Sequence, residues 1–380
     1  MHTKCVWQYH DKKSDFQQVF DYFRYVANEG IRIGIEKNLT SRFRLHYEIY
    51  YKLRSEFYCK YVYGALECAA ATLKIYRNVK RKNPNAKVPH IRKNHLILDN
   101  CAYKIMDGWI RIPIKPHYYC SIKLNHYVLK QIQNAKLGSI TITEDKIIIS
   151  YSKQVTMQNP EHFLAVDRNL DNVTTFNTQN EFQVYDLHKA NQIKQTYRKV
   201  KSKFTRNDIR IKKKIFTKYG KKEKNRVHDI LHQTSKKIVN QNSGIIMENL
   251  KGIRKLYQKG NRQGKKFRGR MNSWSFYELQ RQIEYKARGL GLPVKYVNRA
   301  GTSSKCAVCG ANVVAEKHRM MFCSCCNTVI DRDINAAKNI LARGTKVVPD
   351  GIASEAMMRN PKEQVIHRVD AIQLSHKPTG

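Results

Sequence analysis

The sequence predicts a mixed α/β fold in the second half of the chain, preceded by a helical region and a β-rich region in the first half. Two short apolar runs, Phe163–Asp167 and Gly244–Glu248, are typical of buried strands, and each ends in an acidic residue. A third acidic residue, Asp333, opens a segment whose apolar residues recur at helical spacing up to Leu341. Strands and helices therefore alternate in this half, and three carboxylates lie at their ends.

These three carboxylates, Asp167, Glu248 and Asp333, predict a catalytic metal site. A carboxylate at the C-terminal end of a strand lies at the rim of the sheet, where ligands of α/β sheets bind. Three such groups would repel one another unless cations joined them. Carboxylate oxygens suit Mg²⁺ or Mn²⁺, and two such ions can stabilise the attacking and leaving oxygens of a phosphodiester. A single Asp at a strand end is more often a turn former or a helix cap, so the prediction of a two-metal nuclease depends on all three.

The composition predicts a folded protein with a polyanionic partner. The chain has 380 residues, 41% of them hydrophobic, and a formal net charge of +41. Such a surplus opposes compaction, and nucleic acid is the first partner that it indicates. The sequence has no apolar run of about 18 residues and no signal-peptide core at its N-terminus, so we expect a cytoplasmic protein without membrane contact.

In the first half of the chain, the spacing of apolar residues changes from a helical pattern to a strand-like pattern. Residues 16–79 carry apolar residues at helical spacing, including a tyrosine-rich stretch from about Leu39. The basic run Lys74–Lys93 contains two prolines and is expected to be a linker or an irregular edge. From about Asn94 to Thr156, short alternating runs separated by turns predict a small β-barrel or sandwich, and residues 1–15 are a candidate for its first strand.

The second half follows the ribonuclease H-like order of strand, strand, strand, helix, strand, helix, strand, helix. A strand pair at 173–176 and 182–185 follows the first strand, and a long basic helical stretch covers about 188–240. After Glu248, the basic, glycine-rich segment Lys255–Arg270 is expected to be a mobile loop. A helix capped by Asn272 or Ser273 and a strand at 292–297 come next.

Dense positive charge on the long helical stretch and on the glycine-rich segment predicts contacts with nucleic-acid backbones. The candidate residues are Arg198, Lys199, Lys203, Arg206, Arg210, Lys213, Lys265, Lys266 and Arg268.

Paired cysteines predict one structural zinc ion. Cys306 and Cys309 form one CxxC pair, and Cys323 and Cys326 form another. Four thiolates complete a closed tetrahedral site, which leaves no position for catalysis. Cys325 is surplus, and the remaining scattered cysteines are typical of free thiols in a reducing compartment.

Residues 161–342 resemble the TnpB (OrfB) family of insertion-sequence proteins, which are relatives of the type V CRISPR effector nucleases. The matching pieces are Ala165–Asn169, Ile246–Leu250, Thr302–Gly310 and Asp331–Ile340. The family's catalytic acids correspond to Asp167, Glu248 and Asp333. Asp331 lies nearby, but Asp333 occupies the matching place before Ile-Asn-Ala-Ala. Asn169 departs from the family's usual glycine, although Asn also tolerates the left-handed conformation.

The resemblance implies a domain organisation. The expected parts are the first part of a wedge β-barrel (1–15), an inserted helical recognition lobe (16–93), the remainder of the wedge barrel (94–158), a RuvC-like nuclease domain (159–300 and 330–346) interrupted by a zinc-ribbon target-nucleic-acid-binding insertion (301–329), and a C-terminal tail (347–380).

The resemblance also implies an RNA-guided DNA endonuclease of a transposable element. A structured guide RNA would find a double-stranded DNA target beside a short adjacent motif. Mg²⁺ or Mn²⁺, expected as two ions on the three acids, would support cleavage. Two alternatives remain open: a DNA-joining transposase, and a guide-dependent repressor that binds DNA without cutting it.

Overall fold

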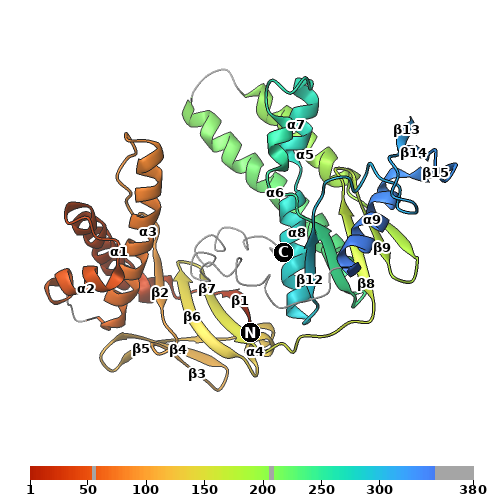
Figure 1. The fold of residues 1–380 in the computed structure, drawn as a ribbon. Coiled ribbons are helices and arrows are strands. Elements are labelled where there is room, and N and C mark those ends of the chain that lie inside the picture. The colour runs from red at the N-terminus through yellow and green to blue at the C-terminus, as the bar shows by residue number, and fades with distance from the viewer. Residues whose placement is uncertain (54–56, 205–208, 347–380) are drawn as a thin grey trace. The chain divides into compact units, whose positions relative to one another are not determined.

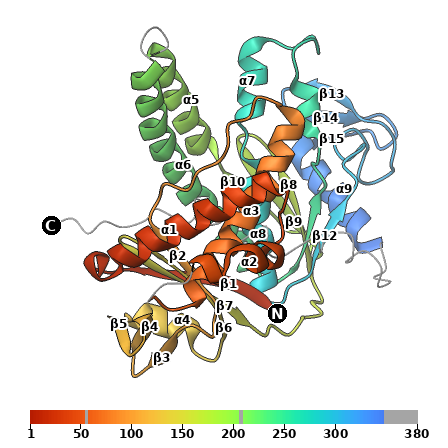
Figure 2. The ribbon, with the colours of Figure 1, turned by 90° about the vertical axis from the view of Figure 1, so that its left-hand side faces the viewer.

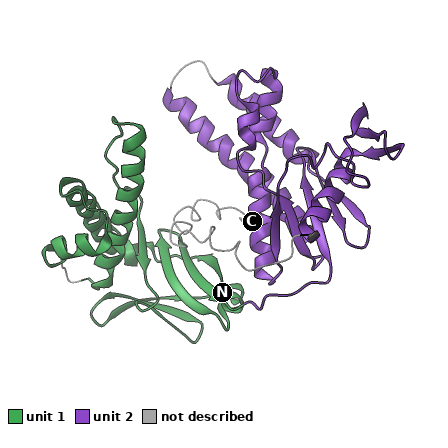
Figure 3. Cartoon of the chain, viewed as in Figure 1, with its two compact units in different colours: residues 1–154 green, residues 155–380 purple. Residues whose placement is uncertain are grey.

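The computed structural model describes residues 1–53, 57–204 and 209–346, and its ribbon is shown in Figure 1. The chain divides into two compact units, Met1–Gln154 and Val155–Gly380 (Figure 3). The expected tail at 347–380 and the candidate contact residue Arg206 lie outside the described residues. No helix in the described ranges is long and apolar enough to cross a membrane.

The first unit combines helices with two sheets. Its elements are β1 (His2–Tyr9), α1 (Lys13–Glu36), α2 (Arg42–Ile49), the 3₁₀ helix η1 (Tyr51–Leu53), α3 (Lys60–Lys82), β2 (His95–Leu98), β3 (Lys104–Met106), β4 (Trp109–Lys115), β5 (Tyr118–Lys123), α4 (His126–Ile132), β6 (Lys136–Thr143) and β7 (Lys146–Lys153). One sheet has the order β1-β7-β6-β2, and the other has the order β3-β4-β5. Since β1 pairs antiparallel with β7, the helices α1 to α3 are inserted between strands of one sheet.

Helices and sheets of this unit share one continuous apolar core. Phe16 and Phe20, at helical spacing on α1, belong to the same buried cluster as Ile110 and Ile112 of β4. Helices α1 and α3 approach closely at Gly30, where a Cβ atom would lie 3.0 Å from the Cβ atom of Ala69. The tyrosine-rich stretch is broken into α2, η1 and α3, and α3 continues to Lys82. The interpretation of Lys74–Lys82 as a linker or irregular edge is therefore wrong, because this part of the run continues the helix α3 and the side chain of Tyr76 is buried.

The second unit contains a five-stranded sheet and a separate three-stranded sheet. Its elements are β8 (Phe163–Arg168), β9 (Asn172–Asn177), β10 (Phe182–Asp186), α5 (His188–Lys203), α6 (Ile209–Val239), β11 (Gly244–Glu248), η2 (Ile253–Tyr257), α7 (Lys265–Ser273), α8 (Phe276–Gly289), β12 (Val294–Val297), β13 (Val314–Lys317), β14 (Met320–Cys323), β15 (Thr328–Asp331) and α9 (Arg332–Lys346).

The five-stranded sheet has the order β10-β9-β8-β11-β12. Strands β8, β9 and β10 pair antiparallel, while β11 runs parallel to both β8 and β12. This is the strand order of the ribonuclease H-like layout expected from the sequence. Helices α5 and α6 lie side by side (Figure 2).

Alternation along the strands divides the core into two layers. Leu164 and Val166 of β8 pack in the cluster that contains α6 and α8 residues. Ala165 of β8 and Ile246 of β11 pack on the opposite face, against Ile340 and neighbouring residues of α9. Since successive side chains alternate between faces, Asp167 and Glu248 have the parity of the α9 face.

The segment between β11 and α8 differs from the prediction. Much of the expected glycine-rich loop is helical, as η2 and α7. The helix expected to begin at Asn272 or Ser273 begins at Phe276 instead, and both candidate caps belong to the last turn of α7. Helix α7 ends at Ser273, and the side chain of the next residue, Trp274, is buried with Phe276 and Leu250 in a small separate cluster.

Candidate functional site

The structure brings the three predicted acids to one end of the five-stranded sheet. Met247 of β11 lies opposite Val166 of β8, so the next residues, Glu248 and Asp167, occupy neighbouring strand ends. Asp333 lies in the first turn of α9, the helix that covers this face. The exposed fractions of Asp167, Glu248 and Asp333 are only 6%, 8% and 5%. Residues far apart in the sequence therefore form one buried cluster of acids.

Burial and mutual repulsion perturb the protonation of this cluster. Burial, together with the negative charges of Glu248 and Asp333, raises the pKa of Asp167 to about 7, although a hydrogen bond from Asn169 opposes the shift. Asn169 Nδ2 donates to Asp167 Oδ2 at 2.8 Å. The raised pKa shows that the negative charges of the three acids are not fully balanced by the protein. Bound cations would supply the missing positive charge.

Two buried oxygen atoms on β9 add to this end of the sheet. Thr174 lies directly opposite Asp167 in the strand pair. Thr174 Oγ1 and Asn172 Oδ1 are buried and have no hydrogen-bond partner among the described residues. Asn172 Nδ2 donates to Asp333 Oδ2 at 3.2 Å. Oxygen atoms with unused lone pairs beside carboxylates fit the ligand preference of Mg²⁺ or Mn²⁺, or of the waters that such ions retain.

The three acids form a more open group than the cysteine cluster described below. Among the described residues, only the four cysteines bring at least three ligand atoms within 4.8 Å of one another. Two ions in a two-metal site lie roughly 3.5–4 Å apart, so carboxylates that hold different ions are not required to meet at one point. The donor set therefore fits divalent cations shared among the acids rather than a single ion held by all three.

A buried arginine that the sequence analysis did not identify bonds the main chain of one of these acids. Arg168 is 2% exposed, and its guanidinium donates to the main-chain oxygen of Glu248 and to Gln280 Oε1, the latter at 2.6 Å. Burial lowers its pKa to about 10, and the neighbouring Tyr296, Glu248 and Asp167 oppose that shift. Arg168 thus holds Glu248, the last residue of β11, through its main-chain oxygen. The position of Arg168 directly after Asp167 was the only feature of the sequence that could have identified it, but the sequence does not show in which direction its side chain points.

A second arginine reaches the cluster from the three-stranded sheet β13-β14-β15. Arg319, between β13 and β14, forms an ion pair with the carboxylate of Asp333. Nothing in the sequence indicated that Arg319 reaches the acid cluster. Asp331, the nearby alternative to Asp333, has a different role: its Oδ1 accepts from the backbone nitrogens of Asp333 at 2.8 Å and Ile334 at 3.1 Å. Asp331 therefore caps the start of α9.

The four predicted zinc ligands meet at one point. The sulfur atoms of Cys306, Cys309, Cys323 and Cys326 all lie within 4.8 Å of one another. The Cys306–Cys326 and Cys309–Cys323 sulfur distances are 3.9 and 3.5 Å. A tetrahedral zinc site with Zn–S bonds of about 2.3 Å requires sulfur separations of about 3.8 Å, so the cluster fits this ion. Cys325 is exposed and outside the cluster.

The cysteine cluster is joined to the helix that carries Asp333. Asn335 is fully buried; its Oδ1 accepts from Ala307 N at 2.9 Å, and its Nδ2 donates to Lys305 O at 2.8 Å. Asn339 Nδ2 donates to the main-chain oxygen of Thr302 at 2.8 Å. The Thr302 hydroxyl in turn donates to Glu248 Oε1. These bonds connect the base of the ribbon, the start of α9 and the acid cluster.

The candidate nucleic-acid contacts lie on three helices. Arg198, Lys199 and Lys203 are exposed on α5, Arg210 and Lys213 are exposed on α6, and Lys265 and Lys266 are exposed on α7. Arg268 on α7 is half-buried and donates to the main-chain oxygen of Gln263. Arg198 likewise donates to Gly269 O, so it helps to hold α7 against α5. The predicted contacts of these residues with nucleic acid stay predictions.

Comparisons with known proteins agree with this arrangement. The family model described as "Cas12f1-like, TNB domain" matches residues 276–340, which include α8, β12 and the cysteine cluster. The TnpB-like protein MJ0751 of Methanocaldococcus jannaschii is 33% identical over 265 residues, which cover 64% of this chain and 94% of the relative. A putative RNA-guided DNA endonuclease of Streptomyces pristinaespiralis is 34% identical over 119 residues, 30% of this chain and 28% of that protein.

A solved structure has a similar fold. The chain in the cryo-EM structure of a Cas12f1–sgRNA–target DNA complex aligns with a TM-score of 0.58 and 16% sequence identity. The alignment covers 86% of this chain and 82% of that chain.

Proposed function

The chain belongs to the TnpB-like family, and from this premise we propose that it is an RNA-guided DNA endonuclease. The observation that carries the proposal is the buried cluster of Asp167, Glu248 and Asp333 at one end of a ribonuclease H-like sheet. Three buried carboxylates that repel one another destabilise the fold, because each costs desolvation free energy. A protein that binds DNA without cutting it would gain nothing that offsets this cost. The comparisons add RNA guidance, since relatives carry that description in their names.

In this proposal Asp167, Glu248 and Asp333 hold two Mg²⁺ or Mn²⁺ ions. These ions would supply activation of water and stabilisation of the leaving oxygen of a DNA phosphodiester. The protein's own groups orient the carboxylates: Asn169 bonds Asp167, the Thr302 hydroxyl bonds Glu248, and Asn172 bonds Asp333. Arg319 adds a positive charge at the same end of the sheet, where it can bind a DNA phosphate.

The ribbon is proposed to hold one structural Zn²⁺ on Cys306, Cys309, Cys323 and Cys326. Its three short strands expose most of their side chains, and its apolar cluster consists of few residues. A metal ion would stabilise such a small element, which lacks a sufficient core of its own.

The remaining assignments follow the family. We propose residues 1–15 and 94–158 as the wedge, 16–93 as the recognition lobe, 159–300 and 330–346 as the RuvC-like nuclease domain, and 301–329 as the target-nucleic-acid-binding insertion. The basic helices α5, α6 and α7 are proposed to contact the backbones of guide RNA and target DNA, because a net charge of +41 requires a polyanionic partner.

The test begins with the RNA that co-purifies when the protein is expressed with its native flanking DNA. One discrete species ending in variable sequence is expected, and changing that sequence should redirect cleavage of a plasmid library. Glu248→Gln should abolish cleavage and retain the RNA. Glu181→Gln, at an exposed turn of the same unit, is the matched control and should cut normally.

Different outcomes separate the alternatives. Guide-directed DNA binding without metal-dependent cutting by the unaltered protein would establish a repressor. Joining of DNA ends would establish a transposase. A random mixture of RNAs with unguided cutting would reject RNA guidance and retain only a basic metal nuclease.

A further inference from the structure

The outer strand of the five-stranded sheet, β10, exposes two large apolar side chains. Phe182 is 56% exposed and Val184 is 51% exposed. Phe176 of β9, directly opposite Phe182, is only 6% exposed because it packs with Ala165 and Ile340 under α9. Directly opposite residues share one face of a sheet, so Phe182 continues this apolar face beyond the area that α9 covers.

The backbone of β10 is also open on the side away from β9, because β10 is the last strand in the order of its sheet. Just before the strand, Asn177 N donates to Glu181 O at 3.0 Å. Such bonds fall on alternate residues of an antiparallel pair. The N–H and C=O groups of Phe182 and Val184 therefore point away from β9. An open edge of this kind is able to pair with a further strand.

The charge of this edge favours a polypeptide over nucleic acid as its occupant. Residues 181–186 contain two carboxylates, Glu181 and Asp186, and no cation, although the whole chain has a net charge of +41. Within the described ranges, neither carboxylate forms an ion pair. Carboxylates repel phosphates, whereas a peptide strand pairs through its backbone and can bring its own cations.

The same carboxylates oppose pairing between two copies of β10. In an antiparallel arrangement about the centre of the strand, Glu181 of one copy would lie opposite Asp186 of the other. Like charges in directly opposite positions destabilise a sheet. The edge therefore favours a different segment, one that has apolar residues and a cation.

The chain contains such a segment at residues 363–374, outside the described residues. Its sequence is Glu-Gln-Val-Ile-His-Arg-Val-Asp-Ala-Ile-Gln-Leu, which includes the cation Arg368. It also includes four β-branched residues, which strands favour: Val365, Ile366, Val369 and Ile372. The earlier residues 350–358 contain only one β-branched residue, Ile352, and so suit a sheet edge less well.

The end of α9 lies within reach of β10. Gly344, near the end of α9, packs directly against Ile246 of β11, on the same face of the sheet as Phe182. Strand β11 is three positions from β10, or about 14 Å at the usual strand spacing. The sixteen residues 347–362 between α9 and the segment can span about 50 Å. The connection is therefore long enough.

We propose that residues 363–374 pair with the open edge of β10 as an additional strand and cover Phe182 and Val184. Their backbone bonds the outward N–H and C=O groups of these two residues, and their apolar side chains extend the face under α9. The added strand is separated from Asp167 by β9 and β10. The inference goes beyond the proposed function, because this edge carries none of the three acids and the test does not measure cleavage.

Hydrogen exchange of the full-length protein, followed by mass spectrometry, tests the pairing. The amides of Phe182 and Val184 should exchange at least tenfold faster in the double variant Val369→Asp/Ile372→Asp than in the unaltered protein. A variant that ends at Lys346 should show the same acceleration. The amides of β8 should stay protected in both variants, which shows that the sheet is folded. Ile352→Asp, which places a charge outside the segment, is the matched control and should behave like the unaltered protein.

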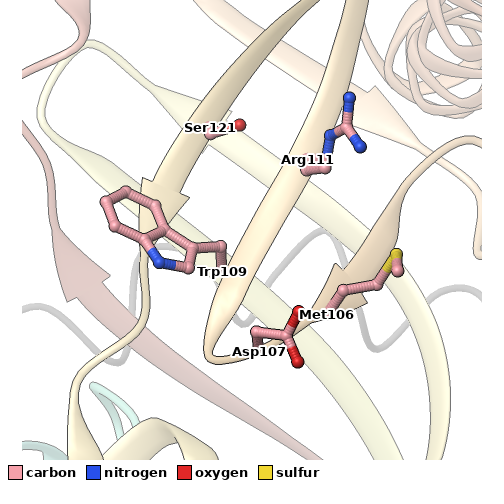
Figure 4. Close-up of a pocket in the computed structure, with 5 residues that line it drawn as sticks. All are labelled: Met106, Asp107, Trp109, Arg111 and Ser121. Carbon is pink, nitrogen blue, oxygen red and sulfur yellow. The ribbon is translucent and has the colours of Figure 1, made fainter.

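A photo-reactive benzoylphenylalanine in place of Val184 locates the occupant. Irradiation should link it to residues 363–374 of the same chain, as a mixture of isotope-labelled and unlabelled copies can show. The control carries this probe in place of Trp109, which is 42% exposed in the first unit, and should give no link to the segment. Trp109 lies in an open hollow of about 370 Å³ (Figure 4). The residues that line this hollow are Met106, Asp107, Trp109, Arg111 and Ser121.

Several results would overturn the proposal. Slow exchange at Phe182 and Val184 that persists in the variant ending at Lys346, or fast exchange in the unaltered protein, would show that the segment does not pair with β10. Links between labelled and unlabelled copies would identify a second copy as the occupant, and links to nucleic acid would identify a nucleic-acid site. Equal acceleration by Ile352→Asp would assign the edge to another part of the tail.

Discussion

The guanidinium of Arg319, in the cysteine-rich ribbon, contacts the carboxylate of Asp333, at the start of the following helix. This ion pair joins the two chemical centres of the second unit. The exposed fractions of the Arg319 and Asp333 side chains are 36% and 6%, so the arginine has solvent access while the acid does not. A DNA phosphate that enters the site can therefore reach Arg319.

Arg319→Ala should lower the rate of DNA cleavage by roughly a hundredfold or more, because it removes a charged donor at the acid cluster. Arg319→Lys should recover part of the rate, since it restores the charge but not the guanidinium geometry. Single-turnover cleavage on pre-bound target measures this effect apart from binding. Lys317→Ala, an exposed cation of the same ribbon, is the control. Unchanged cleavage by Arg319→Ala would show that its ion pair with Asp333 is only structural.

Cys306→Ser should lower the zinc content below one ion per chain and also impair cleavage, since the ribbon positions Arg319. Cys325→Ser should retain both zinc and cleavage, because Cys325 is outside the cluster. Metal analysis of both purified variants gives the zinc content. Full zinc content in Cys306→Ser would contradict the ligand set.

Asp167→Asn should change the pH dependence of stability in the metal-free protein. The folded state raises the pKa of Asp167 from 3.8 to about 7, so the folded protein holds this proton more tightly than the unfolded chain. That stabilisation is full below about pH 3.8 and is lost as the pH rises through 7. The free energy of unfolding of the variant, relative to that of the unaltered protein, should therefore increase as the pH rises between these two values, and the gain should reach about 2–4 kcal/mol at pH 8.

Urea unfolding at pH 4 and at pH 8 in the presence of a chelator measures this difference. Added Mg²⁺ should reverse its sign, because the ion stabilises only the protein that retains the carboxylate. A difference that does not depend on pH would mean that the folded state does not raise the pKa of Asp167.

Arg168→Met should destabilise the second unit by about 2–4 kcal/mol, since it leaves the buried Glu248 carbonyl and Gln280 amide oxygen without their donor. Cleavage should fall as well, because the end of β11 loses its support. Arg226→Met removes an exposed cation from α6 and should alter stability little. Denaturant unfolding of both variants checks the expectation, and equal stabilities would contradict it.

Local patterns in the sequence contained much of the fold and the central residues of the site. The apolar runs of β8 and β11 each predicted a strand that ends in an acid, since a short run of apolar residues is a local property of the sequence. The spacing of Cys306, Cys309, Cys323 and Cys326 likewise predicted their meeting, because two CxxC pairs need only a short ribbon to converge. The mixed sheet followed from the order of these segments.

Tertiary structure decided the contacts that depend on side-chain direction across long sequence separations. Nothing local to Arg319, Arg168 or Asn335 shows that each of them bonds a residue or a helix of the acid cluster. The same is true of Trp109, whose exposure depends on which face of its sheet the remaining core covers. Sequence by itself thus determined which residues can do chemistry, while the packing of β8, β11 and α9 decided which of them meet, because direction and distance arise only when separate elements share a core.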